Sequence, residues 1–293
     1  MVPWLLPVLA SATALGFYDI CKKHAVRDNS VMPVLFWSSA IGALALSAYL
    51  ALRGEFASAF RAPLSEVGLL MLKSLMVGAS WVCVYYAMRE LPITLASPLR
   101  STSPLWTFFG GVLIFHERLS APQLLAAAII FAGYAVFSLC GKMEGFALRS
   151  RGMVLIAAGT LLGSCCALYD KYLLNIRGIP RDRVQLHFML GLVLMLGAAY
   201  LIRTLCFGGR HAFEWRWSIP AIGFILIFAD NVYFYALGLP DTPISLVSLL
   251  RRMSCVVSFG VGALCFGERR LWRKALAMAL FLVGIALLGL FRS

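Results

Sequence analysis

The chain has 293 residues, of which 61% are hydrophobic and 13% are charged, and its mean hydropathy is +0.86. Soluble domains average roughly 45–50% apolar and about 25% charged residues, so this composition excludes a soluble enzyme, a secreted disulfide scaffold and a disordered chain. The formal net charge is +13, and the Lys and Arg side chains that produce it lie mainly at the ends of apolar runs. This placement predicts contact with anionic lipid headgroups and no nucleic-acid partner.

Apolar runs long enough to cross a bilayer fill most of the chain, because a transmembrane helix needs roughly 20 apolar residues. The loops between them are too short for a separate soluble domain. We therefore expect one all-helical membrane protein. The sequence predicts ten helices, approximately at Pro3–Ala25, Met32–Leu52, Val67–Met88, Ile93–Phe115, Ala121–Cys140, Gly152–Leu174, Leu186–Cys206, Ser218–Leu237, Pro243–Phe266 and Trp272–Phe291.

The two halves of the chain match without gaps when one is shifted by 151 positions. A unit of five helices ends on the side opposite its start, so a second copy is inserted upside down. We therefore predict two inverted five-helix repeats, residues 1–142 and 151–293, with a substrate site near the midplane as in secondary transporters. The shift superposes Tyr18-Asp19 on Tyr169-Asp170, the stretch 92–100 on 243–251, Ser103 on Ser254, and Glu117-Arg118 on Glu268-Arg269.

A Glu-Arg pair opens the last helix of each half, at Glu117-Arg118 and at Glu268-Arg269. Together with the ten spans in two halves, it makes the chain resemble the EamA-type branch of the drug/metabolite transporter (DMT) superfamily. The resemblance implies a multi-pass transporter of a bacterial inner membrane, not an enzyme. Family substrates include amino acids, amines, nucleotide sugars, vitamins and lipid-linked sugars, so it does not fix the substrate.

The orientation in the membrane is left open by two opposing indications. The resemblance implies that both termini lie in the cytoplasm. The loops on the side opposite the N-terminus carry more Lys and Arg, which by the positive-inside rule predicts that both termini lie outside.

Ionisable residues inside the predicted spans are costly and usually mark function. From a rise of roughly 1.5 Å per residue, Asp19 and Arg100 fall at one depth, and their repeat copies Asp170 and Arg251 fall together nearer the other face. We predict two acid–base pairs that gate the two sides. Two other interpretations stay open: the arginines bind an anionic substrate group, or the pairs are purely structural.

Asp230 falls near the middle of the eighth predicted span, and the repeat provides no acidic counterpart. A lone acid at this depth fits proton coupling, a counter-ion for a cationic substrate, or an interior acid satisfied by neighbours, with Lys73 as a candidate partner. Aromatic side chains at similar depths could stack a ring or enclose an ammonium group. The predicted substrate-binding residues are Trp81, Tyr85, Trp106, Asp230, Asn231, Tyr233 and Arg252.

The function that these features favour is secondary transport, by alternating access, of a small polar or amphipathic metabolite such as an amine or an amino acid. The main alternative is a flippase for a lipid-linked or phosphorylated anionic substrate, held by Arg100, Arg251 and Arg252. An intramembrane enzyme is disfavoured, since the sequence has no H-E-x-x-H, G-x-G-D or P-loop motif. We expect no cofactor and no metal, and a monomer suffices for this mechanism.

Overall fold

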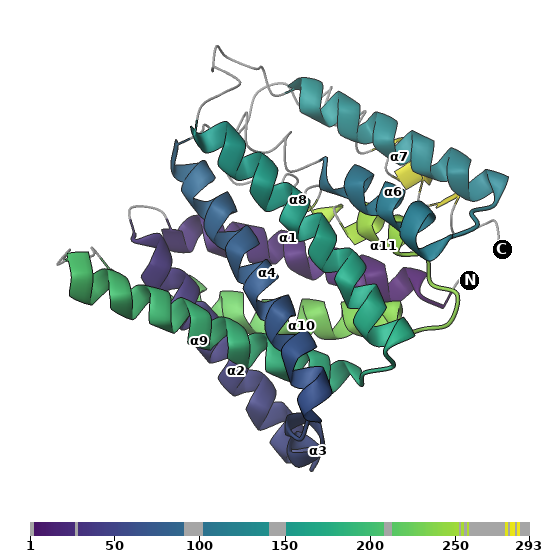
Figure 1. The fold of residues 1–293 in the computed structure, drawn as a ribbon. Coiled ribbons are helices and arrows are strands. Elements are labelled where there is room, and N and C mark those ends of the chain that lie inside the picture. The colour runs from purple at the N-terminus through teal and green to yellow at the C-terminus, as the bar shows by residue number, and fades with distance from the viewer. Residues whose placement is uncertain are drawn as a thin grey trace.

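A computed structural model describes residues 3–26, 29–90, 102–140, 151–207, 213–251, 253–254, 257, 279–280, 282–284 and 286–287. Within these ranges every regular element is a helix (Figure 1), which confirms the all-helical class. The elements are α1 (Leu5–Val26), α2 (Val31–Leu52), α3 (Phe56–Phe60), α4 (Leu64–Glu90), α6 (Ser103–Phe115), α7 (Ala121–Cys140), α8 (Arg151–Lys171), the π-helical η1 (Tyr172–Ile176), α9 (Arg181–Phe207), α10 (Ser218–Leu237) and α11 (Ile244–Arg251).

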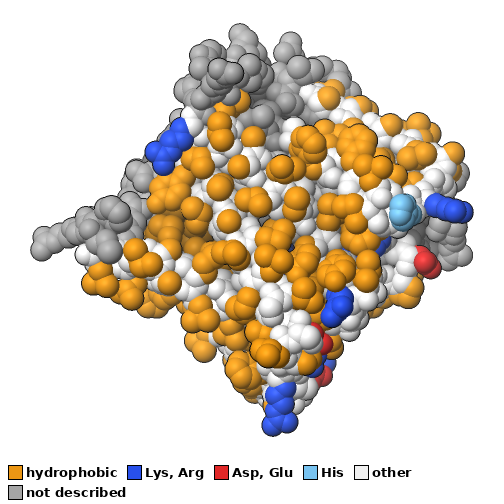
Figure 2. All heavy atoms as spheres, in the orientation of Figure 1, with side chains coloured by type: hydrophobic (Ala, Val, Ile, Leu, Met, Phe, Trp, Pro, Cys, Tyr) orange, Lys and Arg blue, Asp and Glu red, His pale blue; other side chains and the backbone are white. Residues whose placement is uncertain are grey.

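Six spans in the described part of the chain are long and apolar enough to cross a membrane: Leu5–Val26, Val31–Leu52, Leu64–Ala87, Arg151–Ile176, Arg181–Ile202 and Ser218–Leu237. Large apolar side chains such as Leu44, Leu194 and Phe224 are exposed on their outer surfaces. In Figure 2 such side chains cover the visible face, and the charged ones lie towards its edges. The protein is therefore an integral multi-pass membrane protein. Much of the predicted helices 243–266 and 272–291 lies outside the described residues, so the count of ten stays a prediction.

The helices pack in two corresponding arrangements. α1 packs along α10, and α8 packs along α4. α2 contacts α10 and α9, and α9 also contacts α4. Farther along, α6 lies against α8 and α11 (Figure 1). A shift of 151 positions carries α1 onto α8 with η1, α2 onto α9 and α4 onto α10. The contact of α1 with α10 therefore corresponds to that of α8 with α4, and the contact of α2 with α10 corresponds to that of α9 with α4.

The end of the bundle at which α1 begins is called the N-terminal face here. The loops that join α2 to α4, α6 to α7, η1 to α9 and α10 to α11 lie at this face, as the alternating helix directions require. A core of buried side chains that includes Trp4, Leu70, Leu173, Val184 and Ile244 packs behind these loops. These side chains are at most 4% exposed, so packing contacts close the N-terminal face.

α2 and α10 touch through their backbones. A Cβ atom added at Gly223 would lie 2.6 Å from the carbonyl oxygen of Ser38 and 2.8 Å from the backbone nitrogen of Gly42. Small residues of this kind let membrane helices approach closely, where packing contacts replace the missing hydrophobic drive between helices. Gly42 and Gly223 therefore fix the distance between a helix of the first half and a helix of the second.

Candidate functional site

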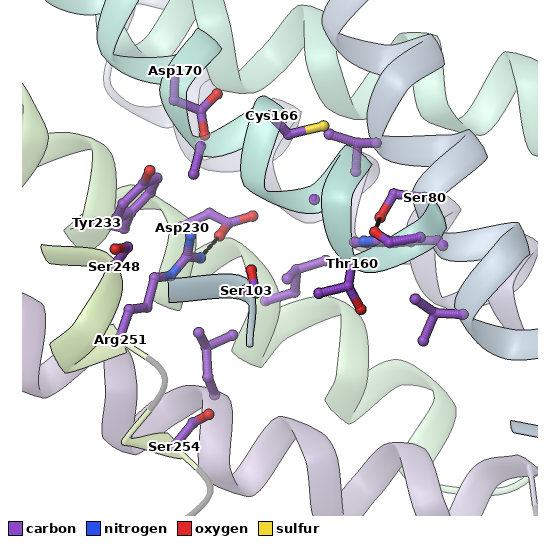
Figure 3. A pocket seen from close by; sticks show the side chains of 18 of the residues that line it. Ser80, Ser103, Thr160, Cys166, Asp170, Asp230, Tyr233, Ser248, Arg251 and Ser254 are labelled. Atoms are coloured by element: carbon purple, nitrogen blue, oxygen red, sulfur yellow. Dashed lines mark hydrogen bonds and ion pairs between the residues drawn. The ribbon is translucent and has the colours of Figure 1, made fainter. Parts of the chain in front are cut away.

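A cavity of about 270 Å³ lies in the interior, between helices of both halves of the chain. Figure 3 shows its lining, with Asp170, Asp230 and Arg251 gathered on one side and Ser80 and Thr160 on the other. By their positions along the helices, the lining residues run from Asp170 and Tyr233 towards the face opposite the N-terminal face. The charged residues of the lining are Asp19, Lys22, Lys73, Asp170, Asp230 and Arg251.

Lys73 on α4 and Asp170 on α8 form the most deeply buried ion pair of the cavity. The Lys73 Nζ donates to Asp170 Oδ1, and the two side chains are only 2% and 9% exposed. The same ammonium lies 4.9 Å from the ring centroid of Phe188 and 4.5 Å from that of Phe234. Ring faces add a favourable electrostatic contact to a desolvated cation. The charge of Lys73 is therefore balanced by Asp170, and its ammonium packs against the two phenylalanine rings.

Arg251, the last residue of α11, pairs with Asp230 on α10. Its Nη2 donates to Asp230 Oδ1, and its guanidinium lies 3.9 Å from the ring centroid of Tyr233. The Nε of Arg251 is buried and has no hydrogen-bond partner among the described residues. An arginine can use its planar fork on two acceptors at once, so this guanidinium retains a donor for another acceptor group.

A third pair lies on α1, where Lys22 and Asp19 are 3.4 Å apart and one helical turn separates them. The ammonium of Lys22 also lies 4.9 Å from the ring centroid of Tyr18 and 5.2 Å from that of Tyr85. The six charges of the described lining thus form three acid–base pairs, one each on α1, between α4 and α8, and between α10 and α11.

The structure combines these charges differently from the sequence expectation. The predicted direct pair of Asp170 with Arg251 is wrong, since Asp170 contacts Lys73 and Arg251 contacts Asp230. The depth estimate gives the position of a residue along its helix, but it does not say towards which neighbouring helix a side chain points. The predicted pair of Asp19 with Arg100 stays a prediction, because Arg100 lies outside the described residues. The gating role of all four residues stays a prediction.

Most of the predicted substrate-binding residues that the structure describes line the cavity: Trp81, Tyr85, Asp230 and Tyr233. Two do not. The Trp106 side chain is 52% exposed on the outside of α6, and Asn231 donates from Nδ2 to Gln185 Oε1 at 3.2 Å, away from the cavity. Arg252 lies outside the described residues.

Several lining residues were missed because small polar side chains on a helix carry no signal of their own. Ser80 donates to the carbonyl of Gly159 at 2.7 Å, and Thr160 to that of Ile156 at 2.7 Å. Ser103 and Ser254, which also line the cavity, were visible only as a matching pair of the repeat. No group of three or more His, Cys, Asp or Glu side chains within the described ranges could hold a metal ion.

The fold and the cavity define the class: a multi-pass helical membrane protein with a polar, charge-paired cavity inside. Residues 2–139, just under half of the chain, match the EamA-like transporter family. This confirms the resemblance drawn from the two Glu-Arg pairs and the helix pattern.

Two curated relatives and one solved structure are similar to the chain. Protein RarD of Streptomyces exfoliatus is 28% identical over 242 residues, which cover 80% of this chain and 70% of RarD. The pseudopaline exporter CntI of Pseudomonas aeruginosa is 27% identical over 152 residues, 48% of this chain and 51% of CntI. A structure described only as "Crystal structure of protein" has a TM-score of 0.73 and 18% identity, and the match covers 98% of this chain and 96% of that one. It shows that the fold is shared.

Proposed function

We propose that the protein is a secondary transporter that moves a small polar or amphipathic metabolite across the membrane by alternating access. The observation that carries this proposal is the interior cavity of about 270 Å³, which is lined by paired charges and shared between helices of both halves. Intramembrane charges usually mark the substrate or ion pathway of a transporter. The family consists of transporters, and we propose no enzymatic activity for this chain.

The mechanism that we propose rests on ten helices in two inverted halves. Two observations support it: the contact of α1 with α10 corresponds to that of α8 with α4, and corresponding helices such as α1 and α8 run in opposite directions. Rocking of inverted repeats about a midplane site is a common plan for secondary transporters. In this cycle the cavity would reach first one face and then the other, with Asp19, Arg100, Asp170 and Arg251 as gating residues.

The size and the charge balance of the cavity favour a compact substrate that bears both signs of charge. Pockets for drug-sized ligands measure roughly 300–1,000 Å³, and this cavity of about 270 Å³ lies just below that range. A lone cation or anion would leave one buried partner of a broken pair uncompensated, at a cost of about 3–5 kcal/mol. An amino acid or a similar zwitterion can replace both partners of a pair, and its carboxylate suits the spare donor of Arg251.

The relatives and the composition support the remaining parts of the proposal. CntI is an exporter of pseudopaline, which supports transport of a small metabolite here too. We propose the inner membrane of a bacterium as the site of action, membrane lipids as the surrounding partners, and no cofactor.

The experiment is thermal unfolding of the purified protein against a panel of amines, amino acids, nucleotides and phospholipids. A ligand at a hundred times its Kd stabilises the folded state by about 2.7 kcal/mol. We expect amino acids to raise the Tm, and we expect both Asp230→Asn and Arg251→Gln to abolish the rise. Glu55→Gln, which alters an exposed ion pair outside the spans, is the matched control and should keep it.

Other outcomes would redirect or contradict the proposal. Stabilisation by amines alone, lost only in Asp230→Asn, would assign a cationic substrate. Stabilisation by phosphate-bearing lipids alone, lost only in Arg251→Gln, would support the flippase. Uptake of a stabilising ligand into proteoliposomes is then required, and a ligand that binds without crossing the bilayer would contradict transport.

A further inference from the structure

Glu117, the acid of the first Glu-Arg pair, is folded back into the protein beside the end of α6. His116 ends α6 in the left-handed region with φ 51°, and the backbone N–H of Glu117 donates to the carbonyl of Gly111 at 3.4 Å. A Cβ atom at Gly111 would lie 2.8 Å from Glu117 Oε2, so a glycine is needed for the carboxylate to lie there. The side chain of Glu117 is only 6% exposed.

The carboxylate of Glu117 accepts hydrogen bonds from the first turn of α11. Its Oε1 lies 2.7 Å from the backbone nitrogen of Ile244, and its Oε2 lies 3.2 Å from that of Ser245 and 2.5 Å from the Ser245 hydroxyl. The first N–H groups of a helix have no partner within the helix, and negative charge is favoured beside them. Glu117 thus caps α11 from another part of the chain.

Lys171, at the end of α8, completes the arrangement. Its Nζ lies 2.5 Å from Glu117 Oε1 and 3.2 Å from the carbonyl oxygen of Thr242, just before α11. One carboxylate therefore joins the end of α6, the end of α8 and the start of α11. The contact with a lysine is specific to the second half, since the equivalent position in the first half is Ile20.

The anchored helix carries a cavity residue at its other end. α11 has eight residues, from Ile244 at Glu117 to Arg251 in the cavity, and seven steps at roughly 1.5 Å each make about 10 Å. Ile244, Leu246 and Val247 are fully buried, so the helix has little room to bend between its ends. A displacement of its first turn is passed on to Arg251.

We infer that Glu117 is a positioning residue that fixes α11 and thereby sets where Arg251 meets Asp230 in the cavity. This gives the acid of the family's Glu-Arg pair a role that neither the resemblance nor the proposed transport assigns. It acts through α11 and touches no substrate. The inference concerns the placement of α11, so its test needs no transport substrate and can fail independently of the proposed function.

The test uses Ser248→Cys as a reporter, since Ser248 lies on α11, one turn before Arg251, and lines the cavity. The purified protein reacts with the charged thiol reagent sulfonatoethyl methanethiosulfonate, and mass spectrometry of the peptide that contains position 248 measures the rate. The labelling rate of the Ser248→Cys protein with the native Glu117 is compared with the rates of the same protein carrying Glu117→Ala, Glu117→Gln or Glu117→Asp. The matched control is Glu66→Ala, which removes a carboxylate on the same face that pairs with Arg183 of α9 at 2.8 Å.

We expect Glu117→Ala to speed labelling of the thiol introduced at position 248 at least tenfold, because the first turn of α11 loses the carboxylate that accepts hydrogen bonds from Ile244 and Ser245. Glu117→Gln keeps an oxygen for the backbone N–H groups but loses the charge, so it should fall between, and Glu117→Asp should restore most of the slow rate. Glu66→Ala should stay within twofold of the parent. The inference would be overturned if the labelling rate stayed unchanged in Glu117→Gln and in whichever of Glu117→Ala and Glu117→Asp folds. It would also be overturned if Glu66→Ala increased the rate equally, because this would indicate a general loosening of the protein.

Discussion

The ion pair of Lys73 with Asp170 provides a quantitative test of how the cavity keeps its charges in the membrane. Lys73→Met removes the cation and leaves the carboxylate of Asp170, whose side chain is 9% exposed, without its base. Asp170→Asn does the reverse and leaves the ammonium of Lys73, which is 2% exposed. The double variant contains neither charge.

Breaking a buried pair by removing one partner costs about 3–5 kcal/mol, whereas removing both charges is often close to neutral. In a domain of this size 1 kcal/mol corresponds to roughly 2–4 °C in Tm. Each single variant should therefore lower the Tm by roughly 6–20 °C. The double variant should recover most of that loss, because no uncompensated charge remains.

The assay is thermal unfolding in one detergent, with all four proteins arranged as a double-mutant cycle. Arg53→Met is the control, since Arg53 and Glu55 form a pair at 2.8 Å whose side chains are 40% and 38% exposed. Exposed pairs contribute at most about 1 kcal/mol, so its Tm should hardly move. Additive losses in the double variant would show that the two charges do not compensate each other, and the reasoning about the cavity would be refuted.

Two further predictions concern packing and the limits of the site. Gly223→Ala should destabilise the protein by about 1–3 kcal/mol, because the new methyl group meets the Ser38 carbonyl at the α2–α10 contact. Gly68→Ala, with open space around it, should instead leave the Tm equal or slightly raised, since Ala favours a helix; the same sign at both positions would contradict the contact. Asn231→Ala should lower the Tm slightly through loss of the bond to Gln185 while leaving ligand-induced stabilisation intact, and a lost ligand response would instead place Asn231 in the site.

The sequence was sufficient for the helical class and for the family resemblance. Periodicity and helix rise locate a residue along the membrane normal, and Asp170, Asp230 and Arg251 do lie within reach of one cavity. Which acid meets which base depends on the rotation of each helix and on its neighbours. These follow from packing across the whole bundle, so the partners of Lys73 and Arg251 were not predictable.

The same limit explains why one of the predicted aromatic residues, Trp106, does not line the cavity. Trp81 and Tyr85 share one face of α4, and that face lines the cavity. Trp106 has a similar depth on α6 but points outwards. An apolar membrane environment accepts aromatic side chains on either side of a helix, so residue type does not distinguish a lipid-facing ring from an interior one.

The three acid–base pairs also bear on the electrical behaviour of a transport cycle. The charges of the described lining sum to zero, so a rocking motion that carries whole pairs moves almost no net protein charge through the field. A membrane potential does work of about 2.3 kcal/mol per elementary charge per 100 mV, and here that work would act chiefly on whatever the cavity contains. The voltage dependence of transport would then report the net charge of the substrate and any accompanying proton, with little contribution from the protein.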